Sequence, residues 1–241
     1  MKRFVDSRLL PSRSLLPMVL AVVLSTCALA LGGGGCASGI APDLTGHTWD
    51  EAESLAGKAG LQLVKRDEMP CFLPAGTVLA QDPLPGIEPT DGTIQVTACR
   101  EPIPVQIKRL QSSDPDGNPK AENDAQIPNL TDGDLNTSWS TERYVSPIFA
   151  NLGAKRGVGL AFTLAEGATM AKISYTLTGW KGEVQKLTSG LPPVAVAQLG
   201  DAQQVTWTEP LASGRIWFYQ LAPMPDGDRN GVTINEIGFY K

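Results

Sequence analysis

The most restrictive feature of this 241-residue sequence is a single short helical pattern followed by β-type runs. Apolar residues recur at helical intervals at Trp49, Ala52, Leu55, Ala56 and Ala59. Thr48 precedes this pattern and Glu51 follows it by three residues, the spacing at which each side chain reaches the other's backbone N–H. Gly60 stands where a left-handed residue ends a helix. The sequence therefore predicts one amphipathic helix between Thr48 and Gly60.

Three short β-type runs follow this helix, at Leu61–Val64, Thr77–Gln81 and Thr93–Cys99. The turn-forming segments Pro74-Ala75-Gly76 and Pro83-Leu84-Pro85-Gly86 separate them. A single helix has one apolar stripe, which it buries against one face of a small sheet. The stretch is therefore predicted to be a small α+β domain with one helix on a three-stranded sheet.

Several spaced motifs of this stretch match the pattern of a known domain. They are Pro42-Asp43-Leu44, Gly46, Glu51-Ala52, Ala59-Gly60-Leu61, Pro74-Ala75-Gly76-Thr77-Val78, Gln81-Asp82-Pro83 and Pro85-Gly86. Their order resembles the PASTA domain, the extracellular repeat attached to penicillin-binding proteins and bacterial serine/threonine kinases. The resemblance covers Pro42–Arg100 and implies ligands of the muropeptide type. A single unit lacks the repeats that many wall sensors of this family use.

The first 36 residues have the pattern of an export leader. Basic residues precede an apolar run from Leu15 to about Leu31, and Gly32–Gly35 lead to Cys36. Small residues before a cysteine fit lipidation at Cys36, although Gly33 stands where a lipobox usually has leucine. An uncleaved N-terminal membrane anchor and simple secretion are the alternatives, because the run approaches the length that spans a bilayer. All three fates place the folded part outside the cytoplasm, and lipidation would make it a bacterial envelope lipoprotein facing the cell wall.

The four cysteines divide into two in the leader and two in the first domain. Cys27 is a weaker candidate for lipidation than Cys36, because it lies inside the apolar run. Cys71 and Cys99 form an even pair in an exported chain, which predicts a disulfide. The only histidine is His47, and one histidine with two cysteines offers too few soft ligands for a metal site. We expect His47 to be a solvated turn residue.

Two short connections divide the chain. Ala37–Ala41 leaves little room between the leader and the first domain, and Glu101–Pro104 is stiff because its prolines alternate with other residues. The predicted organisation is a leader over 1–36, a linker over 37–41, the PASTA-like domain over 42–100, a linker over 101–104 and a second domain over 105–241.

From Val105 to Lys241 the pattern is β throughout. The predicted strands are Val105–Leu110, Gly157–Leu164, Ala171–Thr178, Val194–Leu199, Gln204–Thr208, Arg215–Leu221 and Val232–Tyr240. Ile173, Tyr175 and Leu177 alternate with polar residues, which is the period of a strand with one buried face. Many short runs between turns, with no helical pattern, predict an all-β antiparallel jelly-roll sandwich.

The segment from residue 127 to 141 contains an Asp-Gly-Asp turn before Trp139. It resembles the early turn of discoidin-like, coagulation-factor type C (galactose-binding-like) jelly rolls. The resemblance implies a structural Ca²⁺ held by Asp132, Asp134, Thr137 and the later carboxylate of Glu236. Carboxylates, a hydroxyl and turn carbonyls are the oxygen ligands that Ca²⁺ takes. The alternative is an ordinary solvated turn without metal. The segment also looks like the extracytoplasmic domain that some bacteria append to the lipid II flippase.

The sequence predicts that some aromatic residues pack in the core and that one contacts a ligand. Trp139 is predicted to pack in the core or beside the calcium turn, and Trp217 and Tyr219 lie in phase on one strand and are assigned to the core. Trp180 lies between Gly179 and Lys181 in a predicted loop, which makes it the best single candidate for stacking on a sugar ring. The jelly-roll resemblance implies glycan ligands.

Charge and composition exclude some classes of function. The net charge is −5, without a basic stripe, which excludes nucleic-acid binding. The hydrophobic content of 42% is enough for packed cores. With one histidine and neither a zinc motif nor a nucleophile elbow, the chain shows no recognisable catalytic set, so we expect a non-enzyme without a required cofactor.

Two functions of different classes follow. The first is a membrane-anchored binding protein for peptidoglycan fragments or other cell-envelope glycans. The second is a protein-interaction or spacer module for an envelope partner such as a serine/threonine kinase, a penicillin-binding protein or a lipid II flippase, without a glycan ligand of its own.

Overall fold

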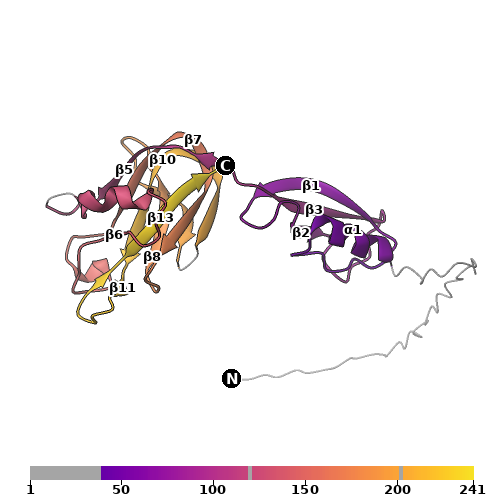
Figure 1. Cartoon of the computed structure of the whole chain (residues 1–241), viewed down its shortest axis with the longest axis horizontal. Helices are drawn as coiled ribbons and strands as arrows, with labels where there is room; N and C mark the ends of the chain where they lie inside the picture. Colours follow the sequence, from indigo (N-terminus) through magenta and orange to yellow (C-terminus); the bar gives the residue numbers. More distant parts are fainter. Residues whose placement is uncertain (1–38, 119–120, 201–202) are drawn as a thin grey trace, which may run out of the picture. The chain divides into compact units, whose positions relative to one another are not determined.

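The computed structural model describes residues 39–118, 121–200 and 203–241 (Figure 1). The predicted leader, the first two linker residues and the lipidation of Cys36 lie outside these residues. Among the described residues, no helix combines the length and apolar character needed to cross a membrane.

The first domain begins its regular structure with α1 (Trp49–Lys58), as the sequence predicts. The Thr48 hydroxyl accepts from the Glu51 N–H at 3.5 Å, and the Glu51 carboxylate accepts from the Thr48 N–H at 3.0 Å. These two bonds satisfy orphan donors at the helix start. The chain leaves the helix through Gly60, whose φ of 75° is the left-handed conformation that glycine adopts without steric cost.

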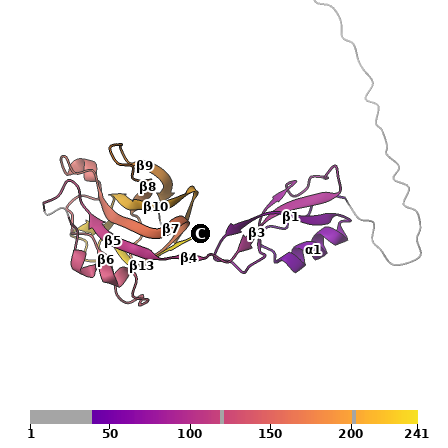
Figure 2. The ribbon, with the colours of Figure 1, turned by 90° about the horizontal axis from the view of Figure 1, so that it is seen from above.

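Three strands follow, β1 (Gln62–Pro70), β2 (Val78–Asp82) and β3 (Thr93–Arg100). β3 lies in the middle of the sheet, parallel to β1 and antiparallel to β2. Figure 2 shows α1 along one side of β1 and β3. The helix buries Ala52 and Ala56 in the same core as Ile94 and Val96 of β3. The prediction of an α+β domain with one helix on a three-stranded sheet is confirmed.

The connections before and after the first domain are both shorter in the structure than the sequence predicts. The Gly39 N–H donates to the Ala59 carbonyl at 3.0 Å, and Ala41 is 2% exposed in the first core. Residues 39–41 are therefore part of the domain rather than a linker. At the other end, Ile103 exchanges two backbone hydrogen bonds with Lys241, and β4 begins at Pro104. Between the end of β3 and the first hydrogen-bonded backbone of the second domain, at Ile103, there are only residues 101 and 102.

The second domain is built from strands and two short 3₁₀ turns. The strands are β4 (Pro104–Val105), β5 (Ile107–Ser113), β6 (Trp139–Ser140), β7 (Val158–Tyr175), β8 (Lys181–Lys186), β9 (Val194–Leu199), β10 (Gln204–Gln220), β11 (Ala222–Pro223), β12 (Asn230–Gly231) and β13 (Thr233–Tyr240), and the 3₁₀ turns are η1 (Asp124–Leu130) and η2 (Phe149–Asn151). The strand order is β4-β13-β7-β10-β8-β9, with β5 on β7 and β6 on β13, and every pair is antiparallel.

The long strands β7 and β10 pair with each other in the middle of this strand order. The first half of β7 pairs with β5 and its second half with β13, and the register against β10 shifts between Thr163 and Ala168. Such irregularities bend strands from one layer into the other. The shift also explains why the sequence predicts separate strands at Gly157–Leu164 and Ala171–Thr178, although both segments lie mostly in the single strand β7. Gln204–Thr208 and Arg215–Leu221 likewise join into β10, and β8 was missed.

Candidate functional site

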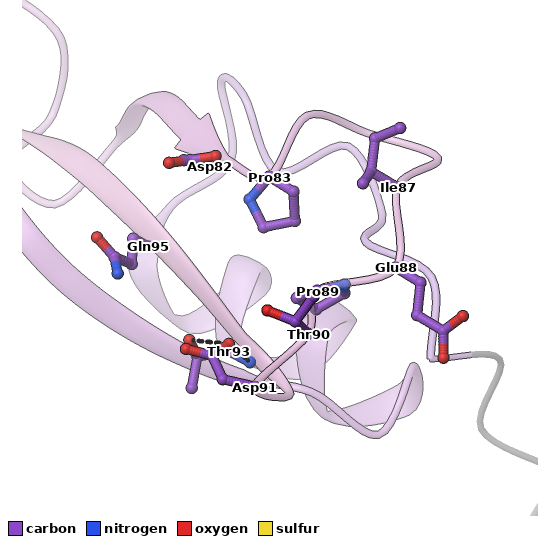
Figure 3. Close-up of a pocket in the computed structure, with 9 residues that line it drawn as sticks. All are labelled: Asp82, Pro83, Ile87, Glu88, Pro89, Thr90, Asp91, Thr93 and Gln95. Carbon is purple, nitrogen blue, oxygen red and sulfur yellow. Dashed lines mark hydrogen bonds between the residues drawn. The ribbon is translucent and has the colours of Figure 1, made fainter.

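An open pocket of about 280 Å³ lies at one end of the first domain's sheet (Figure 3). It is lined by Asp82, Pro83, Ile87, Glu88, Pro89, Thr90, Asp91, Thr93 and Gln95. Figure 3 shows Asp82 and Gln95 on one side of Pro83 and Glu88 on the other, with the Glu88 carboxylate pointing away from Asp82. The end of β2, the start of β3 and the loop between them therefore supply one polar, proline-lined surface.

A buried glutamine fixes the strand end that carries Asp82. Gln81 is 8% exposed; its side-chain carbonyl accepts from the Leu44 N–H at 2.7 Å. Its side-chain NH₂ group donates to the carbonyls of Pro42 and Pro83, each at 3.0 Å. These bonds satisfy buried backbone groups that would otherwise be costly. The motif residues Pro42, Leu44, Gln81 and Pro83 thus act together to shape the pocket.

The opposite wall depends on a turn closed by Asp91. The Thr93 hydroxyl and backbone N–H donate to the Asp91 carboxylate at 2.7 and 3.0 Å. These donors lower the pKa of Asp91, because they stabilise its charged form. Asp91 therefore keeps its charge to a lower pH than an aspartate without these donors.

The chemistry of this pocket is that of recognition. Carboxylates accept hydrogen bonds from ammonium and amide groups, and the prolines offer rigid apolar contact. The carboxylates are Asp82, Glu88 and Asp91, with Gln95 adding an amide. Such a set suits a ligand that carries amino and amide groups beside hydroxyls.

The predicted disulfide is confirmed. Cys71 and Cys99 are joined across a sequence separation of 28, with their Cα atoms 5.5 Å apart. The bond links the residue after β1 to the middle strand β3, and both cysteines are buried. It closes the side of the sheet away from the pocket residues at the start of β3.

The four residues predicted to hold calcium lie near one another. The Thr137 hydroxyl donates to an Asp132 carboxylate oxygen at 2.8 Å, and the Asp134 N–H donates to the other at 2.9 Å. The Gly133 N–H donates to Glu236 of β13, across 103 residues of sequence. The Asp134 N–H and then the Thr137 hydroxyl lower the pKa of Asp132. The Gly133 N–H and Glu236 thus connect the turn to the last strand by a hydrogen bond.

These carboxylate oxygens already accept internal hydrogen bonds. Asp134 accepts from both the backbone and the side chain of Asn136, at 2.9 and 2.7 Å. Within the described ranges, no three His, Cys, Asp or Glu side chains converge as a metal site would require. The turn is ordered by its own donors, and calcium binding stays a prediction.

Trp180 does not contact solvent. It is 1% exposed and packs edge-on against Phe218, with ring centroids 5.3 Å apart, and against Tyr175 at the same distance. The prediction that Trp180 stacks on a sugar is therefore wrong. The reason is that Trp180 precedes the missed strand β8, whose pairing with β10 places the ring over the core.

The other aromatic residues differ from the sequence-based prediction in which of them are buried. Trp139 is fully buried, and its indole N–H donates to the Glu122 carbonyl at 2.8 Å. Trp217 is also buried, under the Arg215 guanidinium 3.8 Å from its ring centre. Tyr219, assigned to the core, is 36% exposed and donates to Gln198 at 3.3 Å. Tyr219 is therefore an aromatic side chain of β10 that is partly open to solvent.

A second polar hollow, of about 540 Å³, opens among the loops of the sandwich. It is lined by Asn123, Gln126, Ser140, Thr141, Glu142, Arg143 and Met224. Asn123 donates to the Ser140 carbonyl at 2.8 Å, and Arg143 pairs with Asp226. The sequence does not predict this hollow, because its residues come from three separate segments with no shared motif.

Comparison with known proteins assigns the first domain. Residues 39–98 match the PASTA domain. The prediction made from the motifs is confirmed, with a start slightly earlier than Pro42. No curated protein shows significant similarity to the chain.

Solved structures similar to the chain include several sandwich domains. A module named CBM32-6, produced by Clostridium perfringens, is 15% identical, covering 56% of this chain and 94% of its own, with a TM-score of 0.36. An F5/8 type C domain from Bacteroides fragilis is 18% identical over 57% of this chain and 96% of its own, with a TM-score of 0.34. A putative alpha-L-fucosidase from Bacteroides thetaiotaomicron is 15% identical over 55% of this chain but 27% of its own, with a TM-score of 0.35.

Proposed function

We propose that this chain is a non-catalytic binding protein of the bacterial cell envelope that holds peptidoglycan fragments or related envelope glycans. The observation that carries the proposal is the PASTA match over residues 39–98, together with the open pocket that this domain presents. The ligand is held without chemical change. The loop hollow of the sandwich, with its amide, hydroxyl and guanidinium groups, supplies a second weak contact with sugars.

The pocket suits the chemistry of a muropeptide. A stem peptide offers ammonium and amide donors, which the Asp82 and Asp91 carboxylates accept, and sugar hydroxyls pair with the hydroxyl of Thr90 and the amide of Gln95. Two weak contacts on one chain combine through effective concentration, so a glycan strand that reaches both is held more tightly than by either.

A protein-interaction role is the second candidate. Leu84 and Ile87, in the loop beside the pocket, are 69% and 54% exposed. Exposed apolar side chains next to a polar groove are typical of protein-binding surfaces. In this case the domain docks on an envelope membrane protein such as a kinase, a transpeptidase or a flippase, and has no glycan ligand.

Membrane anchoring belongs to the same proposal. We infer lipidation at Cys36 from the leader pattern, with the folded part at the outer surface of the cell membrane. Replacing Cys36→Ala is expected to release the protein to the medium. Retention of the variant in the membrane would instead show an uncleaved anchor, and release of the wild-type protein would show simple secretion.

Retention on purified sacculi tests the binding function. The full chain is expected to sediment with the sacculi and to be released by soluble muropeptides. The double variant Asp82→Asn, Asp91→Asn removes two pocket charges while keeping a side-chain oxygen for the Thr93 turn, and retention should fall several-fold. Glu53→Gln, an exposed carboxylate on α1, serves as the matched control and should bind as the wild type. No retention of the wild type would leave the protein-interaction role.

A further inference from the structure

A lysine in the loop before β7 lies among buried acidic groups of the second domain. The Lys155 ammonium is 2.7 Å from a carboxylate oxygen of Asp114 and 3.4 Å from one of Glu122. It also donates to the Tyr144 hydroxyl, which in turn donates to Glu122. Three side chains therefore meet at the Lys155 nitrogen, Asp114 and Glu122 from the loop between β5 and η1 and Tyr144 from the loop between β6 and η2.

This cluster is secluded from water. Asp114 is 3% exposed, Glu122 is fully buried, and the Lys155 side chain is 17% exposed. The second carboxylate oxygen of Asp114 is buried with no hydrogen-bond partner among the described residues. A buried charged oxygen without a partner is costly, because it has lost its hydration without replacement. Buried polar atoms without a partner are rare in folded proteins, and each one calls for an explanation such as a role in a reaction.

Glu122 is held more firmly than a surface carboxylate. Its backbone N–H donates to the Ser112 hydroxyl at 2.6 Å, and its carbonyl accepts from Trp139 at 2.8 Å. Its second carboxylate oxygen accepts from the Glu142 N–H at 2.6 Å. These contacts fix one oxygen of Glu122 toward Lys155 and Tyr144, in the manner of a positioned acid–base group.

The loop that carries Lys155 is anchored beside the same partner segment. Arg156 donates to both oxygens of Asp116, with side-chain contacts at 2.8 and 3.1 Å and a backbone contact at 3.0 Å. This bidentate pair fixes the backbone next to Lys155 and two residues after Asp114. Lys155 and Asp114 are consequently kept in contact on the folding of the domain.

We propose that Lys155 and Asp114 join through an intramolecular amide (isopeptide) bond, with Glu122 as the general acid–base group. The Lys155 amine attacks the Asp114 carboxyl carbon, so that a C–N bond forms and a C–O bond breaks. Two protons leave the nitrogen and reach the departing oxygen, which is released as water. The sum is an ammonium and a carboxylate becoming an amide and one water, with no oxidant or co-reactant.

The hydrogen-bond chain supplies the route for these protons. A proton passes from the Lys155 nitrogen through the Tyr144 hydroxyl to the Glu122 carboxylate, which then delivers it to the leaving oxygen. Burial is the main cause that raises the pKa of Glu122, so this group accepts and carries the proton at a pH where an exposed glutamate would not. Exclusion of water also favours the amide over its hydrolysis.

The bond would lock a large part of the sandwich. It connects the residue after β5 to the loop before β7, across a sequence separation of 41. The enclosed segment contains η1, the turn at Asp132, β6 and η2. Unlike the Cys71–Cys99 disulfide, such a covalent closure is insensitive to reduction.

Peptide mapping of the purified full chain tests the proposal. After reduction and trypsin digestion, the peptides that contain Asp114 and Lys155 are expected as one joined species, lighter than their sum by one water. Trypsin should not cleave after Lys155, because the acylated side chain is no longer a substrate. Recovery of the two unjoined peptides from the folded wild-type protein would overturn the proposal.

Two variants and a control assign the roles. Lys155→Arg retains a positive charge and is expected to abolish the joined peptide, while Lys108→Arg, at an exposed lysine of β5, should leave its yield unchanged. Glu122→Gln keeps the shape of the side chain and should reduce the yield at least tenfold. Circular dichroism confirms that each variant is folded. A joined peptide at wild-type yield in Glu122→Gln would overturn the role of Glu122.

Discussion

The core of the first domain consists largely of alanine and short aliphatic side chains, whereas the second domain encloses several large aromatic residues. Ala52, Ala56 and Ile94 are typical of the first core, and Trp139 and Phe218 of the second. A small apolar core stabilises a domain weakly, so the first domain depends on its disulfide. The second domain also buries ionisable groups such as Glu122. The comparison shows two ways in which an exported chain remains folded.

The largest effect is expected from the second core. Trp180→Ala should lower the free energy of unfolding of the second domain by about 3–5 kcal/mol, because it removes a fully packed aromatic ring. Hydrogen exchange resolved along the chain measures this, and residues 42–100 should keep their protection. A stable second domain with a specific loss of sugar binding would restore Trp180 as a ligand residue.

The next effect concerns the disulfide. Replacing both Cys71 and Cys99 by serine should destabilise the first domain by about 3 kcal/mol in the chain-entropy model. The second domain should be unchanged, as it should be in the wild type treated with reductant. Equal loss of protection in both domains would show that their stabilities are coupled, which would contradict a separate dependence of the first domain on its disulfide.

A third, smaller effect tests the buried acid. The pKa of Glu122 is raised above 4.5, chiefly by burial, against the hydrogen bonds that the Tyr144 hydroxyl and the Glu142 N–H donate to its carboxylate. The folded state therefore binds the proton more tightly than the unfolded state, so stability is present below pH 4.5 and falls as pH rises through the folded pKa. Urea unfolding at several pH values should show this fall, and Glu122→Gln should flatten it. An equally steep profile in the variant would assign the dependence to another group.

The helix cap of the first domain offers a more modest test. Thr48→Ala removes one partner of the capping box and should cost about 1 kcal/mol in the first domain. Chemical denaturation followed by NMR at the indole N–H of Trp49 on α1, which is resolved from the other four tryptophans, reports this loss. Thr45→Ala, an exposed threonine outside the cap, serves as the control. No difference between the two variants would contradict the importance of the cap.

The smallest effect is that of calcium. We expect added Ca²⁺ to raise the melting temperature of the second domain by a few degrees, and Glu236→Gln to remove this rise. Chelator should return the wild type to the metal-free value. If calcium and chelator leave the melting temperature of the wild type unchanged, the Asp132 turn is an ordinary hydrogen-bonded turn.

The sequence predicted the first domain well because its signals are local. The capping box at Thr48 and Glu51, the glycine after α1 and the proline turns each act within a few residues. The disulfide could be predicted because only two cysteines remained outside the leader. The second domain's strands β7 and β10 could not be divided correctly, because the register shift that bends them depends on pairing with distant strands.

The candidate sites also differ in whether local sequence or distant strand pairing determines them. The Asp132 turn and Glu236 were brought together by a recognisable pattern, and the structure places them in one cluster. Trp180 was misassigned, because its burial follows from a strand pairing that leaves no mark on the local sequence. The cluster around Lys155 joins residues from separate loops, so only the fold reveals it.

Titration of the full chain with a soluble muropeptide, followed by amide NMR, tests the central proposal most directly. We predict saturable shifts at the pocket, centred on Asp82, Asp91 and Thr93, which weaken in Asp82→Asn, Asp91→Asn and persist in Glu53→Gln, with the muropeptide recovered intact. Absence of shifts at these residues, or conversion of the muropeptide into another product, would contradict the account.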